Sequence, residues 1–366
     1  MSVLIFLLVL VALILVHEFG HFLIAKRSGI RVDEFGIGFP PRLFGKKYGE
    51  TLYSLNAIPF GGFVKIFGED REEVDKDDKD ISRAMFNKGR WAQATVLFGG
   101  VFFNILFAWI IFAATFSIGT TAAVTEENKN FISGQELVVA EVLEGAPASE
   151  AGFLAEDVIL GISARGEAIQ NGNADEVASF IERYSESELT ISYLREDEEG
   201  SVSLTPVLGL LEDESAPAIG VAMVDVGELK YPLHLAIFES GMFTLESLWA
   251  VTLGILGFLG NALLLSADLS QIAGPVGIVS LVGDASALGF VTLLSFTAFI
   301  SLNLAVINLL PFPALDGGRL VFLGIEAIKG SPIKPKVARM ANGIGFALLI
   351  FLMLAVTYSD VLRLVG

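Results

Sequence analysis

Apolar residues in this chain gather in long unbroken runs instead of short periodic stretches. Strongly apolar regions lie at about 2–25, 94–118, 236–265 and 272–315, and a fifth spans about 341–358. Because an α-helix needs about 20 apolar residues to cross a bilayer, several of these runs are long enough to span one. The pattern, in a chain that is 53% hydrophobic, predicts a polytopic α-helical membrane protein.

Basic residues between the runs predict which side of the membrane each loop faces. Segment 26–91 carries 13 Lys and Arg and segment 319–339 carries five, so the positive-inside rule places both in the cytoplasm. An odd number of crossings must then connect the loop before 236 to the loop at 319. The run 236–265 contains two glutamates and an asparagine, so we expect it to lie in the interface or to re-enter. About four transmembrane helices result, with one crossing at about 290–312 and both termini outside.

The acidity of the chain belongs to one segment. Residues 119–235 hold 23 Asp and Glu against 5 Lys and Arg, whereas the rest of the chain is balanced. This charge predicts a solvated extracytoplasmic domain and argues against nucleic acid as a partner, because phosphates would be repelled.

Within that segment, residues 135–208 show strand-like runs, a helical stretch over Asn173–Tyr184 for which Asn173 can serve as the N-cap, and a hairpin around Glu196–Gly200. The run Val142–Ile159 resembles a PDZ domain of the permuted bacterial type, in a single copy. The resemblance implies an inserted α+β domain that takes a peptide ligand by strand addition. A spacer without a ligand is the alternative.

The first apolar run contains an H-E-x-x-H motif, His17-Glu18-Phe19-Gly20-His21. Residues i and i+4 share one face of a helix, so both histidines can bind one metal ion while Glu18 points into the same site. A charged carboxylate at mid-membrane costs roughly 2.5–3.5 kcal/mol, which a bound cation would offset. The run has no basic n-region and no small-residue cleavage site, so we expect it to be retained. The motif predicts zinc-dependent peptide hydrolysis; histidines satisfied by neighbouring helices are the alternative.

A third metal ligand is expected because catalytic zinc usually takes three protein ligands and leaves a position for water. The chain has no cysteine, so that ligand must be a histidine or a carboxylate. In the segment Asn308–Gly318, Pro311 and Pro313 break the last part of an apolar helix. Unwound backbone at membrane depth is tolerated where it lines a cavity, so Asp316 can reach the two histidines. A helix-capping aspartate is the alternative.

Taken together, the two motifs resemble the site-2 protease family of intramembrane zinc metalloproteases, and the PDZ-like insertion makes the chain most similar to the regulator-of-sigma-E protease branch. The resemblance implies one Zn²⁺ per chain, bound by His17, His21 and Asp316. It implies that Glu18 is the catalytic acid and base. It also implies substrate contacts by asparagines, here Asn303 and Asn308, for which helix–helix hydrogen bonding is the alternative.

Residues 31–67 alternate like strands and resemble the membrane-reentrant β-loop of that family. Gly36, Gly38, Gly61 and Gly62 allow close approach of another backbone. A transmembrane substrate must unwind before hydrolysis, and a β-edge could accept its unwound backbone. We therefore expect this β-hairpin or sheet to bind substrate; a purely structural cytoplasmic hairpin is the alternative.

The predicted organisation has four parts. Residues 1–118 form the N-terminal membrane part, 119–210 the PDZ-like domain, 211–290 an interfacial or re-entrant connection, and 291–366 the C-terminal membrane part.

The predicted function is cleavage of transmembrane segments of single-span proteins, such as anti-sigma factors or signal-peptide remnants. The protein would lie among lipids in a prokaryotic inner or plasma membrane. A non-catalytic scaffold that uses the PDZ-like domain is the alternative function. A metal transporter is less well supported, because few ionisable residues lie in the apolar runs beyond the proposed site.

Overall fold

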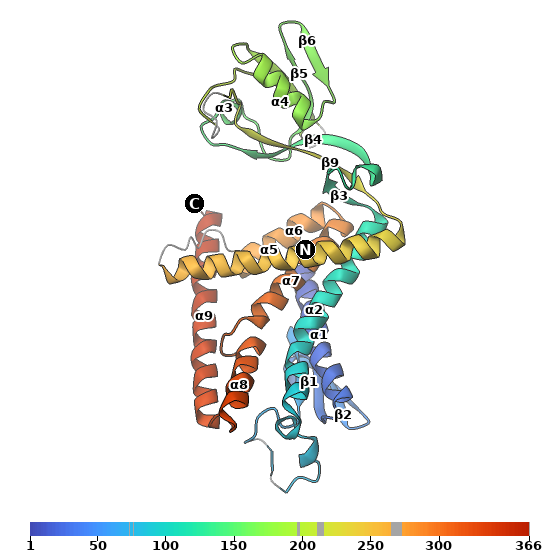
Figure 1. The fold of residues 1–366 in the computed structure, drawn as a ribbon, viewed down its shortest axis with the longest axis vertical. Helices are drawn as coiled ribbons and strands as arrows, with labels where there is room; N and C mark the ends of the chain where they lie inside the picture. The colour runs from blue at the N-terminus through green and yellow to red at the C-terminus, as the bar shows by residue number, and fades with distance from the viewer. Residues whose placement is uncertain (73, 76, 196–197, 211–215, 265–272, 366) are drawn as a thin grey trace. The chain divides into compact units, whose positions relative to one another are not determined.

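The computed structural model describes residues 1–72, 74–75, 77–195, 198–210, 216–264 and 273–365 (Figure 1). Two compact units share the chain: a helical unit, Met1–Thr115 with Leu233–Gly366, and a β-rich unit, Phe116–Pro232. The tip of the hairpin predicted at Glu196–Gly200 and the start of the connection predicted at 211–290 lie partly outside the described residues.

Seven α-helices are described in the helical unit, and six of them match the apolar runs. Their bounds are α1 Ser2–Arg27, α2 Arg90–Ile118, α5 Leu233–Leu263, α6 Pro275–Ala287, α7 Phe290–Leu309, α8 Asp316–Lys329 and α9 Pro335–Val365. Among the described helices, α1, α2, α5, α7 and α9 are long and apolar enough to cross a membrane. The predicted polytopic helical class is confirmed.

Glycines bring α1 and α2 into close contact. A Cβ on Gly20 would lie 2.3 Å from the carbonyl oxygen of Gly99, and a Cβ on Gly99 would lie 2.9 Å from that of Gly20. Small residues at such crossings let helix backbones approach in the absence of a hydrophobic driving force. This contact sets the H-E-x-x-H helix directly against α2.

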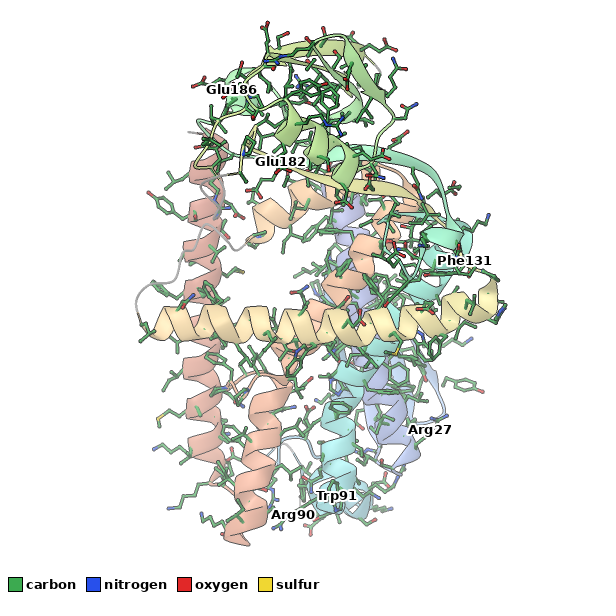
Figure 2. All side chains as sticks on the ribbon, turned by 45° about the horizontal axis from the view of Figure 1, so that its top comes forward. Arg27, Arg90, Trp91, Phe131, Glu182 and Glu186 are labelled. Carbon is green, nitrogen blue, oxygen red and sulfur yellow. The ribbon has the colours of Figure 1, made fainter. Side chains whose placement is uncertain are left out.

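Helix α5 runs across the direction of α9 instead of alongside it (Figure 1). It packs on the other helices through a few contacts: Trp109 Nε1 donates to the carbonyl of Ile237 at 2.9 Å, and Phe243 meets Phe112 edge to face. Apolar side chains project outward from α9 (Figure 2), and Phe351 is 71% exposed. Such a surface suits lipid contact.

Helix α6 is attached to α9 through a buried carboxylate. Asp360, 4% exposed, accepts hydrogen bonds from the backbone N–H groups of Gly274 and Gly277 at 3.2 and 2.8 Å. Because the first N–H groups of a helix have no intrahelical partner, this aspartate caps α6 from another helix.

Strands β1 (Val32–Tyr48) and β2 (Thr51–Ile66) form a folded-over sheet beside α1. The hairpin closes where Tyr48 pairs with Thr51. The first half of β1 has partners on both sides: Gly36 is in register with both Ser54 and Phe63. The edges of this sheet are therefore formed by the second half of β1 and the last residues of β2.

The turn of that hairpin is held by an ion-pair network. Glu50 accepts from Arg83 Nη1 at 2.6 Å and from Lys26 Nζ at 2.6 Å. The hydrogen bonds from Arg83 and then Lys26 lower the pKa of Glu50 from 4.5 to about 2. This network joins the end of α1 to the loop before α2.

We expect Glu50→Gln to destabilise the protein near neutral pH by about 1–2 kcal/mol, a value reduced for solvent screening. Because the folded pKa of Glu50 lies below the unfolded one, its contribution is present above about pH 4.5 and is lost toward pH 2. Thermal unfolding in detergent at pH 7, 4 and 2.5 would measure it. An equal difference in thermal stability between the wild type and Glu50→Gln at all three pH values would contradict this role of Glu50.

The β-rich unit carries strands β3 Thr120–Ala123, β4 Ile132–Val142, β5 Val158–Ala164, β6 Glu167–Gln170, β7 Leu189–Arg195, β8 Glu198–Leu204 and β9 Val221–Leu229. The order in the sheet is β3-β9-β4-β5-β7-β8, with β6 paired to β5. Two short helices complete it, α3 Pro147–Glu150 and α4 Ala174–Arg183. The N-cap predicted at Asn173 is confirmed: it forms a capping box with Glu176.

Strand β9 extends this unit beyond the range 119–210 expected for the inserted domain. It pairs with β4 along its length, from Val142 with Val221 to Ile132 with Leu229. Distant strands are joined here by backbone hydrogen bonding, which the local sequence pattern does not reveal. The connection expected at 211–290 is thus divided between β9 in one unit and α5 and α6 in the other.

Candidate metal centre and active site

Helix α1 presents three polar side chains to the interior of the helical unit. His21 is 7% exposed, and its Nδ1 lies 2.8 Å from the carbonyl oxygen of Val96 on α2. A carbonyl only accepts, so Nδ1 carries the proton and the neutral ring leaves a lone pair on Nε2. His21 is thereby fixed in the tautomer that binds a metal through Nε2.

The break between α7 and α8 carries the third polar group. Helix α7 ends before Pro311, Ala314 takes a positive φ of 79°, and Asp316 opens α8. The backbone N–H of Ala314 is satisfied by the side chain of Asn342, 3.2 Å away. The two prolines interrupt the helix as the sequence predicts, and the chain turns back with Asp316 facing α1.

Three ligand atoms converge at this point. Asp316 Oδ2 lies 3.1 Å from His17 Nε2 and 3.2 Å from His21 Nε2, and the two Nε2 atoms are 3.1 Å apart. A tetrahedral zinc ion with bonds of about 2.0–2.1 Å holds its ligands roughly 3.3 Å apart. Asp316 Oδ2 is buried without a hydrogen-bond partner. Three converging lone pairs of this kind fit a divalent cation.

A cavity of about 390 Å³ surrounds the three groups. Glu18 lies in its wall, and the backbone N–H of Val64 at the end of β2 donates to the Glu18 carboxylate. Polar side chains from other elements also line it: Asn104, Asn308 and Arg319. The cavity therefore offers a carboxylate, amide donors and a guanidinium around one metal centre.

Asn104 on α2 was missed from the sequence, although it is a polar residue within an apolar run. It is fully buried, its Nδ2 lies 3.3 Å from His17 Nδ1, and its Oδ1 has no partner. An amide rotated by 180° would bring Oδ1 to Nδ1, and the two orientations are nearly indistinguishable by shape. Asn104 would then accept the Nδ1 proton of His17, as Val96 does for His21, and leave Nε2 for the metal.

We expect Asn104→Leu to lower zinc affinity roughly 10–100-fold, because outer partners of a metal-bound histidine fix its tautomer and orientation. Competition with a zinc chelator on the purified protein in detergent would measure it. Asn104→Asp keeps an acceptor and should retain more zinc than Asn104→Leu. Equal affinity in all three proteins would remove Asn104 from this role.

The structure brings together some of the predicted substrate residues. Asn308 lines the cavity, and a Cβ on Gly62 would approach the Glu18 side chain within 4.0 Å. In the described part of the chain, Asn303 is not among the cavity residues, and its amide donates to the carbonyl of Phe299 one turn earlier.

The other three glycines serve the packing of the sheet. A Cβ on Gly36 would lie 2.4 Å from the Phe63 ring, and one on Gly38 would lie 2.7 Å from the carbonyl of Ile58. Gly61 has a positive φ of 109° and faces Ile14 of α1. Close contacts and backbone conformation within the protein itself therefore account for glycine at these three positions.

The sequence matches the family described as Peptidase family M50 over residues 5–352. The chain therefore belongs to peptidase family M50, and it is a membrane-embedded zinc metalloprotease of the site-2 type.

Relatives align over almost the whole chain. A Clostridium perfringens protein, whose name assigns it provisionally to the zinc metalloproteases, is 36% identical over 96% of both chains. Zinc metalloprotease RasP of Geobacillus kaustophilus is 30% identical over 98% of this chain and 97% of that protein. The regulator of sigma-W protease RasP of Bacillus subtilis is 28% identical over 99% of each.

One similar solved structure is the PDZ domain of the SdrC-like protein from Listeria monocytogenes. It is 18% identical, with a TM-score of 0.21, and covers 25% of this chain and 90% of that one.

Proposed function

We propose that this protein cleaves peptide bonds within the transmembrane segments of single-span proteins, with one Zn²⁺ bound by His17, His21 and Asp316. The observation that carries the proposal is the convergence of three lone pairs from two separate helices beside Glu18. Peptide hydrolysis needs an acid and base beside the metal, and Glu18 follows His17 directly in the chain.

Zinc at this centre would lower the pKa of a bound water toward ~7 and polarise the scissile carbonyl. Glu18 would take the proton of the attacking water and later deliver it to the leaving amine. The Val64 N–H would orient the Glu18 carboxylate for that transfer. Asn308 would donate to the carbonyl oxygen as negative charge develops there.

The last residues of β2 are the best place for the unwound substrate. The first half of β1, with Gly36, is paired on both sides, so a third strand cannot be added there. Residues 62–66 pair with β1 and border Glu18. A substrate strand along this edge would bring its carbonyl groups to the metal centre. Phe63→Pro should cut cleavage and leave zinc bound; unchanged turnover would refute this placement.

The topology is also part of the proposal. A cytoplasmic position of the loops at 26–91 and 319–339, with α5 in the interface, is supported by the crosswise course of α5 (Figure 1). The β-rich unit would then be extracytoplasmic, and the protein would lie in the cell membrane of a prokaryote. Cysteine at Leu264, which is 77% exposed, gives a label site in a chain without cysteine. Labelling of this site from the cytoplasmic side would contradict the topology.

The substrates would be anti-sigma factors or signal-peptide remnants. The name of the Bacillus subtilis relative, a regulator of sigma-W protease, supports the first class. The β-rich unit would bind a peptide from the substrate or limit access to the membrane part. A scaffold that only uses this unit to hold partners is the alternative.

Glu18→Gln tests the proposal, because it keeps the shape of the side chain and removes the base. We expect cleavage of a single-span reporter to fall at least 100-fold, in line with the loss of general acid–base catalysis, while zinc content stays at the wild-type level. Single-span proteins that accumulate in cells with this variant would be the substrates. Unchanged cleavage would favour the scaffold function instead.

A further inference from the structure

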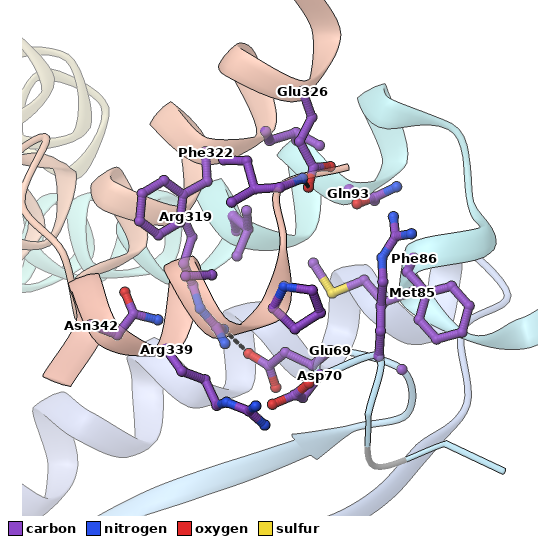
Figure 3. Close-up of a pocket in the computed structure, with 17 residues that line it drawn as sticks. Glu69, Asp70, Met85, Phe86, Gln93, Arg319, Phe322, Glu326, Arg339 and Asn342 are labelled. Carbon is purple, nitrogen blue, oxygen red and sulfur yellow. Dashed lines mark hydrogen bonds and ion pairs between the residues drawn. The ribbon is translucent and has the colours of Figure 1, made fainter. Parts of the chain in front are cut away.

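A second cavity of about 190 Å³ adjoins the catalytic one (Figure 3). It lies among the segment after β2, the start of α2, and helices α8 and α9. Glu69, Leu97 and Arg319 line both cavities, so the two are neighbours that share one wall. Arg319 thus borders both the metal centre and this space.

Three guanidinium groups, those of Arg71, Arg319 and Arg339, line the second cavity together with the carboxylates of Glu69, Asp70 and Glu326. Arg319 of α8 forms an ion pair with Glu69 (Figure 3), and Arg339 of α9 forms one with Glu72. The Arg319 and Arg339 side chains are 37% and 57% exposed. Both arginines thus already bind carboxylates, and both are open enough to exchange them.

One part of the cavity wall is apolar. It includes Met85, Phe86, Phe322, Ile333 and Pro335. An apolar wall beside several guanidinium groups matches a particular ligand, namely a free carboxylate on an apolar chain. The volume is enough for the last one or two residues of a peptide.

Peptide hydrolysis in the neighbouring cavity makes that chemical group. The C–N bond breaks, the water oxygen stays on the acyl carbon as a carboxylate, and the nitrogen takes both protons of the water and leaves as an ammonium. A carboxylate at membrane depth is costly unless a cation accompanies it. Arg319 is the guanidinium group that lines both the catalytic cavity and the second one.

We propose that the second cavity is a binding site for the new C-terminal carboxylate of the cleavage product. Arg319 and Arg339 release Glu69 and Glu72 and bind the product carboxylate in their place. The exchange keeps each arginine compensated, and the apolar wall receives the terminal side chains. This inference rests on the proposed endopeptidase function.

The experiment compares two ligands that differ in one group. The probes are an N-acetylated hexapeptide of leucine and alanine with a free C-terminal carboxylate and the same peptide as its C-terminal amide. Binding is measured on the full chain with the Glu18→Gln substitution and zinc loaded, in detergent, so that the result does not depend on turnover. We expect the acid to bind at least 10-fold more tightly than the amide.

Three further substitutions in that background identify the site. Arg339→Gln should reduce the preference for the acid to less than about threefold. Glu72→Gln should raise affinity for the acid, because it removes the internal competitor for Arg339. Lys336→Gln, an exposed cation on the same helix that is not among the cavity residues, should leave the preference unchanged.

Other outcomes would overturn the proposal. An equal acid preference in all four proteins would mean that the carboxylate binds zinc itself. No preference in any of them, or weaker acid binding in Glu72→Gln, would mean that the two ion pairs only join the segment after β2 to α8 and α9. Failure of wild-type cleavage would refute the endopeptidase function without deciding this site, because the binding assay is independent of turnover.

Discussion

Replacing Gly100 with alanine is expected to remove zinc and activity together. A Cβ at this position would lie 2.5 Å from His21 Nε2 and 2.7 Å from His17 Nε2. The two atoms that would bind the metal are thus in contact with the α2 backbone, and neither ring can move away without leaving the site. We expect zinc affinity to fall roughly 100-fold or more, because both histidines are displaced at once.

Zinc content after dialysis against a weak chelator, together with cleavage of a single-span reporter, would measure this loss. Gly324→Ala is the matched control, because a Cβ at Gly324 would meet no atom within 4 Å. That variant should keep zinc and activity. A Gly100→Ala protein that retains full zinc occupancy would show that α2 does not shape the metal centre.

The sequence was enough to predict the parts of the site that follow from chemistry at fixed spacing. His17, Glu18 and His21 lie within one helical turn and a little more, so their shared face is a local property. Asp316 was predictable because two prolines before it break an apolar helix, and a break at membrane depth needs a reason. The structure brings these four residues to one cavity.

The residues that the sequence could not supply act through contacts between distant segments. Asn104, Gly100 and Val64 reach the site only because α1 packs closely on α2 and β2 folds back beside α1. An asparagine or a glycine in an apolar helix has many possible roles, and a backbone N–H has no sequence signal at all. Arg319 was likewise read only as part of a basic loop that fixes sidedness.

The fold shows the same division between local pattern and distant pairing. The apolar runs predict most of the helices, and the acidic composition of one segment predicts the separate unit. Strand β9 was not found, because its partner β4 lies some 80 residues earlier in the chain. The alternation in segment 31–67 predicts strands. It does not predict that the first half of β1 lies inside its sheet, with partners on both sides.

Gly317→Ala is expected to damage the other half of the site. A Cβ at Gly317 would lie 2.2 Å from the carbonyl oxygen of Leu310 and 2.3 Å from that of Leu309. The first turn of α8 is therefore pressed against the end of α7, and any side chain there forces the two apart. Asp316, the preceding residue, would move away from the histidines.

The expected result differs from that of Gly100→Ala, because His17 and His21 stay in place. We expect zinc affinity to fall about 10–100-fold, since one ligand of three is misplaced, and cleavage to fall further. Zinc competition and reporter cleavage would be measured on the same preparations. Gly343→Ala on α9, where a Cβ would meet nothing within 4 Å, is the control.

Comparison with Asp316→Ala then separates the effect of moving Asp316 from the effect of removing its carboxylate. If Gly317→Ala acts by moving Asp316, the double variant Asp316→Ala/Gly317→Ala should bind zinc no more weakly than Asp316→Ala alone. The effects of substitutions at residues that act as a unit are not additive. Additive losses would mean that the close contact of α8 with α7 supports the centre by another route. A non-additive result would show that the break between α7 and α8 holds the Asp316 carboxylate against His17 and His21 on α1.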